Sequence, residues 1–317
     1  EVLESFDLLD PAGCDEALTT ARAGYAAWRE WPIGKRADAL RQLAAAFRAS
    51  ADRYARDITL EMGKPIRQAQ GEVEKCALVC DWYAEHGPEL IADEPTTVED
   101  EKAYVSFLPL GVVLAVMPWN FPLWQVIRAA APIMLAGNAF TLKHAQNVLR
   151  SAANALEAFT AAGFPAGAFS LLNVSRHEIP SVIADVTLTG SVGAGSAVAA
   201  EAGRHIKKLV LELGGSDPFI VLADADLDAA VAAAVTARFQ NSGQVCIAAK
   251  RLILEAPIAE PFTERFVAAT ARLKVGDPLD PATDVGPMAR ADLREELHAQ
   301  VLRSVQAGAR LLAGGQP

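Results

Sequence analysis

From Gly111 onward, short apolar runs alternate with amphipathic stretches, and this alternation constrains the fold more than any other feature of the chain. Expected strands are 112–117, 140–143, 169–174, 186–189 and 208–213, and the expected helices between them are 124–136, 151–162 and 193–203. Short apolar runs flanked by helices are typical of parallel strands that are buried on both faces. The pattern therefore predicts an α/β fold, in which helices cover both sides of a parallel sheet.

The rest of the chain is mostly helical in its periodicity. Further expected helices are 15–29, 37–59, 66–86, 224–239 and 293–307, and further expected strands are 103–107 and 251–255. A chain of 317 residues is long enough to form two domains. No internal repeat or low-complexity segment interrupts this organisation.

The composition limits the classes of function. Hydrophobic residues make up 51% of the chain and charged residues 21%, so a substantial core can form. The formal net charge of -10 argues against a nucleic acid or an anionic membrane as a partner. No apolar run approaches the ~20 residues that a membrane span needs. The 4 cysteines do not form a disulfide framework, and we expect a cytoplasmic protein.

Cys246 and Glu212 are the residues best suited to chemistry. A thiol is a strong nucleophile near neutral pH because part of it is already thiolate. Glu212 stands in Leu211–Gly215, where two glycines suit a tight turn, and a carboxylate can move protons and activate water. Each residue has a simpler interpretation, since a lone cysteine is often a small buried hydrophobe and Glu212 could only end a strand. Together they favour covalent catalysis by sulfur.

Cys76 and Cys80 lie four residues apart on an expected helix. They could be two ligands of a metal ion, but two ligands alone make a weak site. We expect both cysteines in the core, and we predict no metal site.

Five short motifs surround the two candidate residues, in the order and at about the spacings of one known family. They are Met117–Pro122, Leu142–Lys143, Thr189–Gly195, Leu211–Gly215 and Gly243–Cys246. On these motifs the chain resembles the aldehyde dehydrogenase superfamily from its first residues to its last. Three further segments, Cys80–Gly87, Trp124–Gln125 and Gly214–Val221, are similar to the bacterial branch that uses succinate semialdehyde.

The resemblance implies a role for each catalytic residue. Cys246 would attack the aldehyde, and Glu212 would activate the water that hydrolyses the thioester; burial is expected to bring the Glu212 pKa toward neutrality. Asn120 would donate its side-chain N–H to the oxyanion, together with the backbone N–H of Cys246. Pro118 and Pro122 would hold the backbone around Asn120, although the same segment could be only a buried turn.

The cofactor that the resemblance implies is NAD or NADP. Gly190 would permit the turn after a strand, and Ser191 with the following helix N-terminus would present N–H groups to a pyrophosphate. Lys143 would bind the adenosine ribose. Gln146 is neutral where strict NAD users often carry a glutamate, so NADP is not excluded by charge. The expected cofactor residues are Trp119, Lys143, Gln146, Gly190, Ser191, Gly195, Leu213 and Gly214.

Arg128 is the predicted anchor for the substrate. It lies eight residues after Asn120, about two turns along a helix that starts near Pro122. Members that use succinate semialdehyde place an arginine here for the distal carboxylate, a task that suits a guanidinium group; a surface arginine is the alternative. Some members carry a second arginine six residues before the nucleophile, where this chain has Gln240. The expected substrate-binding residues are Arg128, Trp124 and Gln240.

The resemblance also assigns the domains. We expect a Rossmann-like dinucleotide-binding domain at 1–90 and 111–213, a β-hairpin arm at 91–110 that reaches another subunit, and an incomplete catalytic domain at 214–317. The arm implies a homodimer or a homotetramer. The chain ends roughly two-thirds of the way through a typical member, and the link from Asn173 to Val186 is short. We expect that residues have been left out of the sequence at both places. The alternative is a truly truncated chain, and the intact mass of the protein would distinguish the two.

These expectations combine into one predicted function. The protein would be an NAD(P)-dependent enzyme that oxidises an aldehyde, most specifically succinate semialdehyde to succinate, through a cysteine thiohemiacetal and a thioester. One alternative is a related aldehyde dehydrogenase for another small aldehyde. A second is an inactive truncated scaffold, which the joint presence of Cys246, Glu212 and Asn120 opposes.

Overall fold

The computed structural model describes residues 3–98, 101–175, 177–179 and 185–316. Helices and parallel strands alternate along it, and the predicted α/β class is confirmed. The chain divides into two compact units: Glu1–Asp57 with Gln70–Leu213, and Ile58–Ala69 with Gly214–Pro317. The short link after Asn173 includes residues 176 and 180–184, which lie outside the described residues.

The first unit is built on a five-stranded parallel sheet with the strand order β5-β4-β3-β6-β7. The strands are β3 (Val112–Met117), β4 (Ala139–His144), β5 (Phe169–Leu171), β6 (Asp185–Gly190) and β7 (Leu209–Leu213). The chain runs from β3 through β4 to β5 at one edge, and then returns to the other side of β3 with β6 and β7. The strand order therefore reverses between β3 and β6, at the topological switch point where α/β sheets bind ligands.

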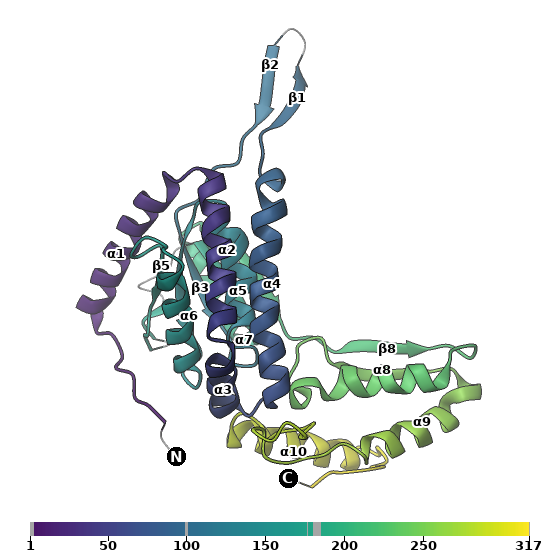
Figure 1. Cartoon of the computed structure of the whole chain (residues 1–317). Helices are drawn as coiled ribbons and strands as arrows, with labels where there is room; N and C mark the ends of the chain where they lie inside the picture. The colour runs from purple at the N-terminus through teal and green to yellow at the C-terminus, as the bar shows by residue number, and fades with distance from the viewer. Residues whose placement is uncertain (1–2, 99–100, 176, 180–184, 317) are drawn as a thin grey trace. The chain divides into compact units, whose positions relative to one another are not determined.

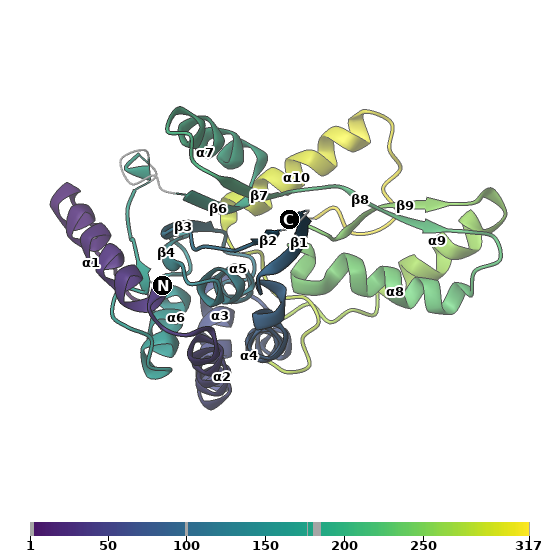
Figure 2. The same ribbon diagram turned by 90° about the horizontal axis from the view of Figure 1, so that it is seen from above.

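Helices cover both faces of this sheet, as Figure 2 shows. On one face, Cys14 of α1 and Val198 of α7 belong to the same core as Leu114, Val186 and Leu188 of the strands. On the opposite face, α5 and α6 pack against β3, β4 and β5, and α2 packs on both of these helices. The helices are α1 (Pro11–Arg29), α2 (Ile33–Ala49), α5 (Trp124–Leu135), α6 (Leu149–Ala161) and α7 (Val192–Arg204), with α3 (Ala51–Met62) and α4 (Ile66–Leu90) crossing the division between the units.

Capping residues set where several helices begin. Asp10 caps α1, because its Oδ1 accepts a hydrogen bond from the Gly13 N–H at 2.8 Å and Pro11 follows as the first helical residue. The helix therefore begins before the predicted residue 15. The expected helix at 37–59 is two helices, since α2 ends at Ala49 and α3 begins at Ala51.

A β-hairpin extends from the end of α4, as Figure 1 shows. In it, β1 (Glu94–Val98) pairs antiparallel with β2 (Glu101–Val105). The strand predicted at 103–107 is thus one half of a hairpin and begins two residues earlier. Tyr104 is 63% exposed, so the hairpin carries apolar surface into solvent. Its role in oligomerisation stays a prediction.

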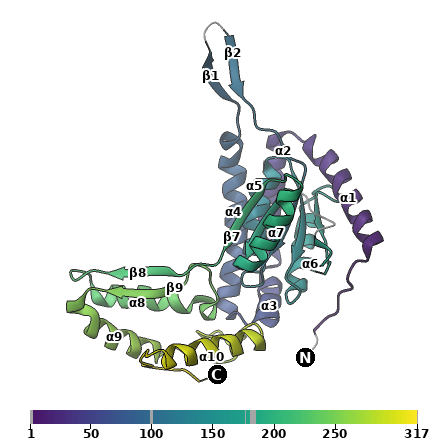
Figure 3. The ribbon, with the colours of Figure 1, turned by 180° about the vertical axis from the view of Figure 1, so that it is seen from behind.

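The second unit contains two parallel strands, β8 (Asp217–Val221) and β9 (Ala249–Leu254). Two helices pack with them around Val221, Val231 and Phe262, and Figure 3 shows these elements side by side. The helices of this unit are α8 (Leu227–Phe239), α9 (Ala256–Thr270) and α10 (Ala291–Gln306). Neither β8 nor α9 was predicted. Within the described residues, no helix is long and apolar enough to cross a membrane.

Candidate active site

The parallel strands of the first unit bring the predicted residues to one edge of the sheet. Lys143 lies at the end of β4, Asn120 follows β3, Ser191 follows β6, and Glu212 lies at the end of β7. All five strands run in one direction, so these carboxyl ends share an edge. Four motifs of the first unit that are far apart in the sequence therefore lie along one edge of the sheet, which includes the switch point between β3 and β6.

Asn120 is half-buried in the segment Met117–Pro122, which connects β3 to α5 and is called the Asn120 loop below. The loop closes around His144, the last residue of β4, whose side chain is buried. His144 Nε2 lies 2.8 Å from the carbonyl oxygen of Pro122, and Nδ1 lies 3.2 Å from that of Met117. One side chain therefore contacts both ends of the loop.

Glu72 of α4 holds the start of α5. Its Oε1 accepts hydrogen bonds from the N–H groups of Leu123 and Trp124, each at 2.9 Å. The first N–H groups of a helix lack partners within the helix, and the helix dipole favours a carboxylate there. Trp124, a predicted substrate residue, also has the Lys75 ammonium 3.9 Å from its ring centroid. Sequence reasoning missed Glu72 and His144; the one available signal was that His144 directly follows a predicted ligand.

The predicted cofactor residues lie at the ends of β4 and β6. Lys143 is partly buried, burial lowers its pKa, and its ammonium group donates to the carbonyl oxygen of His144 at 3.1 Å. Ser191 is the N-cap of α7, where its Oγ accepts from the Ala194 N–H at 3.2 Å. The first turn of α7 is exposed at residues 191–194, and an exposed helix N-terminus fits a phosphate group.

The glycine predictions need correction. Neither Gly190 nor Gly214 has a positive φ, and a Cβ at either position would meet no close contact. The chain can therefore turn at both places without glycine. A Cβ at Gly195 would lie 2.6 Å from Leu213 Cδ2, so the Leu213 side chain would have to shift to admit it. Gly195 and Leu213, both predicted to bind the cofactor, therefore lie where α7 packs closely on β7.

Arg128 and Glu212 come together beside the end of β7. Arg128 Nη1 lies 3.8 Å from Glu212 Oε2, and Arg128 Nη2 donates to Thr189 Oγ1 at 3.4 Å. Both charged side chains line a cavity of about 590 Å³ between α5, β6 and β7. The expected burial of Glu212 is not observed, since its side chain is 56% exposed at the end of an edge strand.

Cys246 belongs to the second unit, where it lies in a turn between α8 and β9. It is half-buried, whereas Cys14, Cys76 and Cys80 are buried. Burial raises the pKa of the Cys14 and Cys80 thiols. The ammonium group of Lys250 donates to the carbonyl oxygen of Cys246 at 2.7 Å. The predicted nucleophile is therefore the most accessible of the cysteines.

The turn that precedes this cysteine has a left-handed backbone. The φ angles of Asn241, Ser242 and Gly243 are 53°, 54° and 76°, and this region costs roughly 1–2 kcal/mol for a residue other than glycine. Hydrogen bonds hold the turn. The Asn241 N–H donates to Gln68 Oε1 at 2.7 Å, and Ser242 Oγ accepts from the Gly286 N–H at 3.0 Å.

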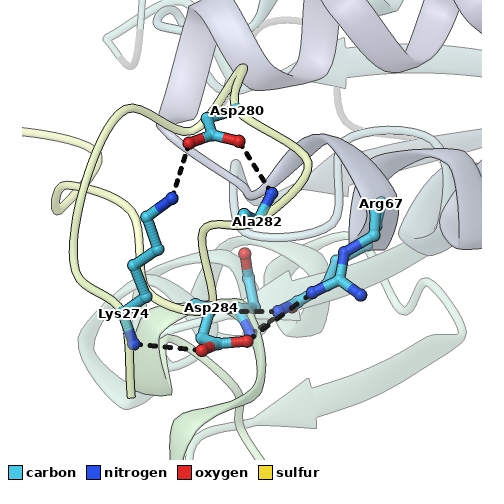
Figure 4. A network of polar contacts seen from close by, with 7 residues as sticks. Arg67, Lys274, Asp280, Ala282 and Asp284 are labelled. Atoms are coloured by element: carbon cyan, nitrogen blue, oxygen red, sulfur yellow. Dashed lines mark hydrogen bonds and ion pairs between the residues drawn. The ribbon is translucent and has the colours of Figure 1, made fainter. Parts of the chain in front are cut away.

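Figure 4 shows a polar network within the second unit that includes Arg67, Lys274, Asp280 and Asp284. Asp284 accepts from the backbone N–H of Lys274 at 3.0 Å and lies 3.6 Å from Arg67 Nη2. The Lys274 ammonium group pairs with Asp280 at 2.7 Å. Gln68 donates to the carbonyl oxygen of Asp284 at 3.4 Å, so the residue that binds the turn is itself fixed by the network.

The remaining predicted residues lie at the surface or near it. Trp119 is half-buried next to Asn120, while Gln146 is exposed just after β4. Gln240 is exposed at the end of α8 and donates its N–H to the carbonyl oxygen of Thr236. Their positions agree with access to a ligand, and their roles stay predictions.

The fold and this edge of the sheet are those of an α/β enzyme that binds a nucleotide cofactor at a switch point. The family model described as the aldehyde dehydrogenase family matches residues 1–317, and the chain belongs to that family. The membership predicted from the five motifs is confirmed.

Relatives with named activities cover nearly all of this chain. It is 55% identical over 321 residues to succinate semialdehyde dehydrogenase Sad of Escherichia coli, covering 99% of this chain and 70% of the relative. It is 49% identical over 304 residues to a probable succinate-semialdehyde dehydrogenase of Synechocystis, covering 94% of this chain and 67% of the relative. The crystal structure of succinic semialdehyde dehydrogenase from Streptococcus pyogenes in complex with NADP+ has a TM-score of 0.97 at 38% identity, covering 100% of this chain and 71% of that one.

Proposed function

We propose that the protein oxidises succinate semialdehyde to succinate and passes the hydride to NAD or NADP. The observation that carries the proposal is the place of Arg128, whose guanidinium group lines the same cavity as Glu212. A guanidinium group there suits the distal carboxylate of a semialdehyde. The names of the relatives support this choice, since one is given for NAD(P)+ and another was solved with NADP+.

In the proposed mechanism, Cys246 Sγ attacks the aldehyde carbon and forms a thiohemiacetal. The side-chain N–H of Asn120 and the backbone N–H of Cys246 donate to the oxyanion. When bound, the nicotinamide cofactor supplies the hydride acceptor that lets the thiohemiacetal become a thioester. Glu212 then takes a proton from water, the water attacks the thioester carbon, and the acid leaves while Cys246 regains its thiolate.

The residues at the sheet edge fit the proposed cofactor. The exposed first turn of α7, with Ser191 as its N-cap, would bind the pyrophosphate. Lys143 at the end of β4 would bind the ribose, and the neutral Gln146 repels neither cofactor. In this proposal the segments 1–90 and 111–213 bind the dinucleotide, residues from 214 onward supply the nucleophile, and the hairpin at 91–110 joins subunits into a homodimer or a homotetramer.

A second candidate is an aldehyde dehydrogenase for an uncharged small aldehyde. One observation favours it: the Arg128 guanidinium group already has Glu212 and Thr189 as partners within the protein, so it does not need a substrate carboxylate as a counter-ion. In addition, Gln240 stands where some enzymes for succinate semialdehyde carry a second arginine.

Steady-state kinetics would separate the two candidates. The purified protein is given NAD or NADP with succinate semialdehyde or with butanal, and formation of the reduced nicotinamide is followed by absorbance. We expect kcat/KM to favour succinate semialdehyde by about tenfold or more, the value of a charge-assisted contact. Equal values would favour the uncharged substrate, and no reduction with either aldehyde would contradict aldehyde oxidation.

A further inference from the structure

We propose that His144 and Glu72 are positioning residues for Asn120, which hold the end of its loop and the start of the following helix so that the side-chain amide points at the oxyanion. The proposal rests on the proposed function, because it takes the oxyanion role of Asn120 as given. Neither residue needs to contact the substrate. Both act through the backbone of the loop and of the helix that follows it.

The hydrogen-bond partners of His144 define its tautomer. A carbonyl oxygen only accepts, so Nε2 carries the proton that it donates to Pro122 at 2.8 Å. The Ala145 N–H donates to Nδ1 at 2.9 Å, so Nδ1 carries none. Burial lowers the pKa of His144 to about 4, which keeps the ring neutral at physiological pH. The neutral ring therefore donates only to Pro122, at the end of the loop, and the Met117 carbonyl oxygen lies 3.2 Å from an Nδ1 that has no proton to donate.

Glu72 fixes the chain immediately beyond the loop. It is 3% exposed and comes from α4, so its contact with Leu123 and Trp124 ties the start of α5 to a different element. The loop is therefore connected to β4 by His144 and to α4 by Glu72. A shift of either element would move the backbone that carries Asn120.

The effect of these contacts on the reaction rate depends on how accurately the loop orients Asn120. An oxyanion donor is effective only when it points at the developing charge, and a misplacement of about 1 Å can cost on the order of a hundredfold in rate. Pro118 and Pro122 restrict the backbone on both sides of Asn120. With its end at Pro122 and the residues that follow it fixed, the loop has fewer ways to turn the amide away.

A double-mutant cycle would test the proposal in the protein. The variants are Asn120→Ala, His144→Leu, their combination, Glu72→Leu and Glu72→Gln. The matched control is Asn154→Leu, a buried α6 residue that donates to Asp57 at 2.9 Å, away from the loop. The measurement is the first-turnover rate of cofactor reduction at saturating aldehyde, with thermal unfolding recorded for every variant.

We expect Asn120→Ala to slow the first turnover by about a hundred- to a thousandfold, as for other oxyanion donors. His144→Leu and Glu72→Leu should slow it by about ten- to a hundredfold with little change in KM. Glu72→Gln should keep most of the rate, because its amide oxygen still accepts from the two N–H groups. The variant with both Asn120→Ala and His144→Leu should be about as slow as Asn120→Ala alone. For the control, any fold-loss in rate from Asn154→Leu should multiply with the fold-loss from Asn120→Ala.

Two outcomes would overturn the proposal in different ways. If the losses from Asn120→Ala and His144→Leu multiply, His144 acts independently of Asn120 and only the positioning role is lost. If Asn120→Ala is as fast as the unmodified protein, the oxyanion role fails and the proposed mechanism fails with it. If His144→Leu does not fold, His144→Gln keeps one N–H donor, and nitrogen-15 NMR of the unmodified protein must show a neutral ring protonated at Nε2.

Discussion

The guanidinium group of Arg128 lies 3.8 Å from the carboxylate of Glu212. The proposed substrate anchor and the proposed base are therefore neighbours. The side chains of Arg128 and Glu212 are 37% and 56% exposed, so solvent screens the pair, and it contributes only about 0–1 kcal/mol to stability. Its importance is chemical, since a substrate carboxylate that binds Arg128 must share that guanidinium group with Glu212.

Replacing Arg128 with Leu should therefore affect a charged substrate most. The loss of a charge-assisted contact should raise KM for succinate semialdehyde by roughly ten- to a hundredfold. The kcat/KM for butanal should hold or improve, because butanal has no charge to anchor. The matched control is Arg56→Leu, which removes an exposed arginine of α3 outside the site. Equal losses on both aldehydes would make Arg128 structural and would remove the assignment to succinate semialdehyde.

Replacing Glu212 with Gln should separate the two halves of the reaction. The thioester should still form, because its formation depends on Cys246, but water should be poorly activated. We expect a burst of reduced cofactor followed by a slow steady rate in a stopped-flow experiment. A steady rate equal to that of the unmodified protein would assign the base to another residue.

Iodoacetamide should modify Cys246 before the other cysteines. Cys246 is half-buried in a turn, whereas the other three are buried and burial raises the pKa of two of them. Peptide mass spectrometry over a time course would show the order of labelling. Replacing Cys246 with Ala should leave a slowly labelled protein that still binds the cofactor and whose turnover falls by more than about a thousandfold. Faster labelling of Cys14 would contradict this prediction.

The pH dependence of stability should report on His144. Burial lowers its pKa from 6.5 to about 4, with a smaller contribution from the nearby Lys143. Between these values the unfolded chain binds a proton that the folded chain excludes, so stability falls as the pH drops through this window. The loss should be on the order of 3 kcal/mol by pH 4.

Urea unfolding at several pH values would measure this loss. The unmodified protein and His144→Leu should differ in slope between pH 6.5 and 4, because only the first carries the titrating ring. Parallel curves would mean that His144 does not remain neutral in the folded protein.

Periodicity predicted the elements of the first unit because its strands are short, apolar and buried on both faces, as at Val112–Met117. Periodicity failed where tertiary packing determines where a helix begins or ends, as at the break between α2 and α3 at Ser50 and for α9, which was not predicted. The motifs located Asn120, Lys143 and Glu212 because each follows or ends a strand. Glu72 and His144 could not be found in this way, since a buried polar residue shows its purpose only through partners that are distant in the chain.

The reversal of strand order between β3 and β6 has a consequence for how the protein is made. The Asn120 loop belongs to the part of the chain that is synthesised first, and the N-terminus of α7 is synthesised only after β4, β5 and β6. A nascent chain that stopped after β5 would contain the Asn120 loop and β4 but would lack β6 and the N-terminus of α7, which complete the proposed nucleotide site. Dinucleotide binding would then begin only with the finished sheet, and the cellular concentration of the dinucleotide would help draw newly made chains into the folded state.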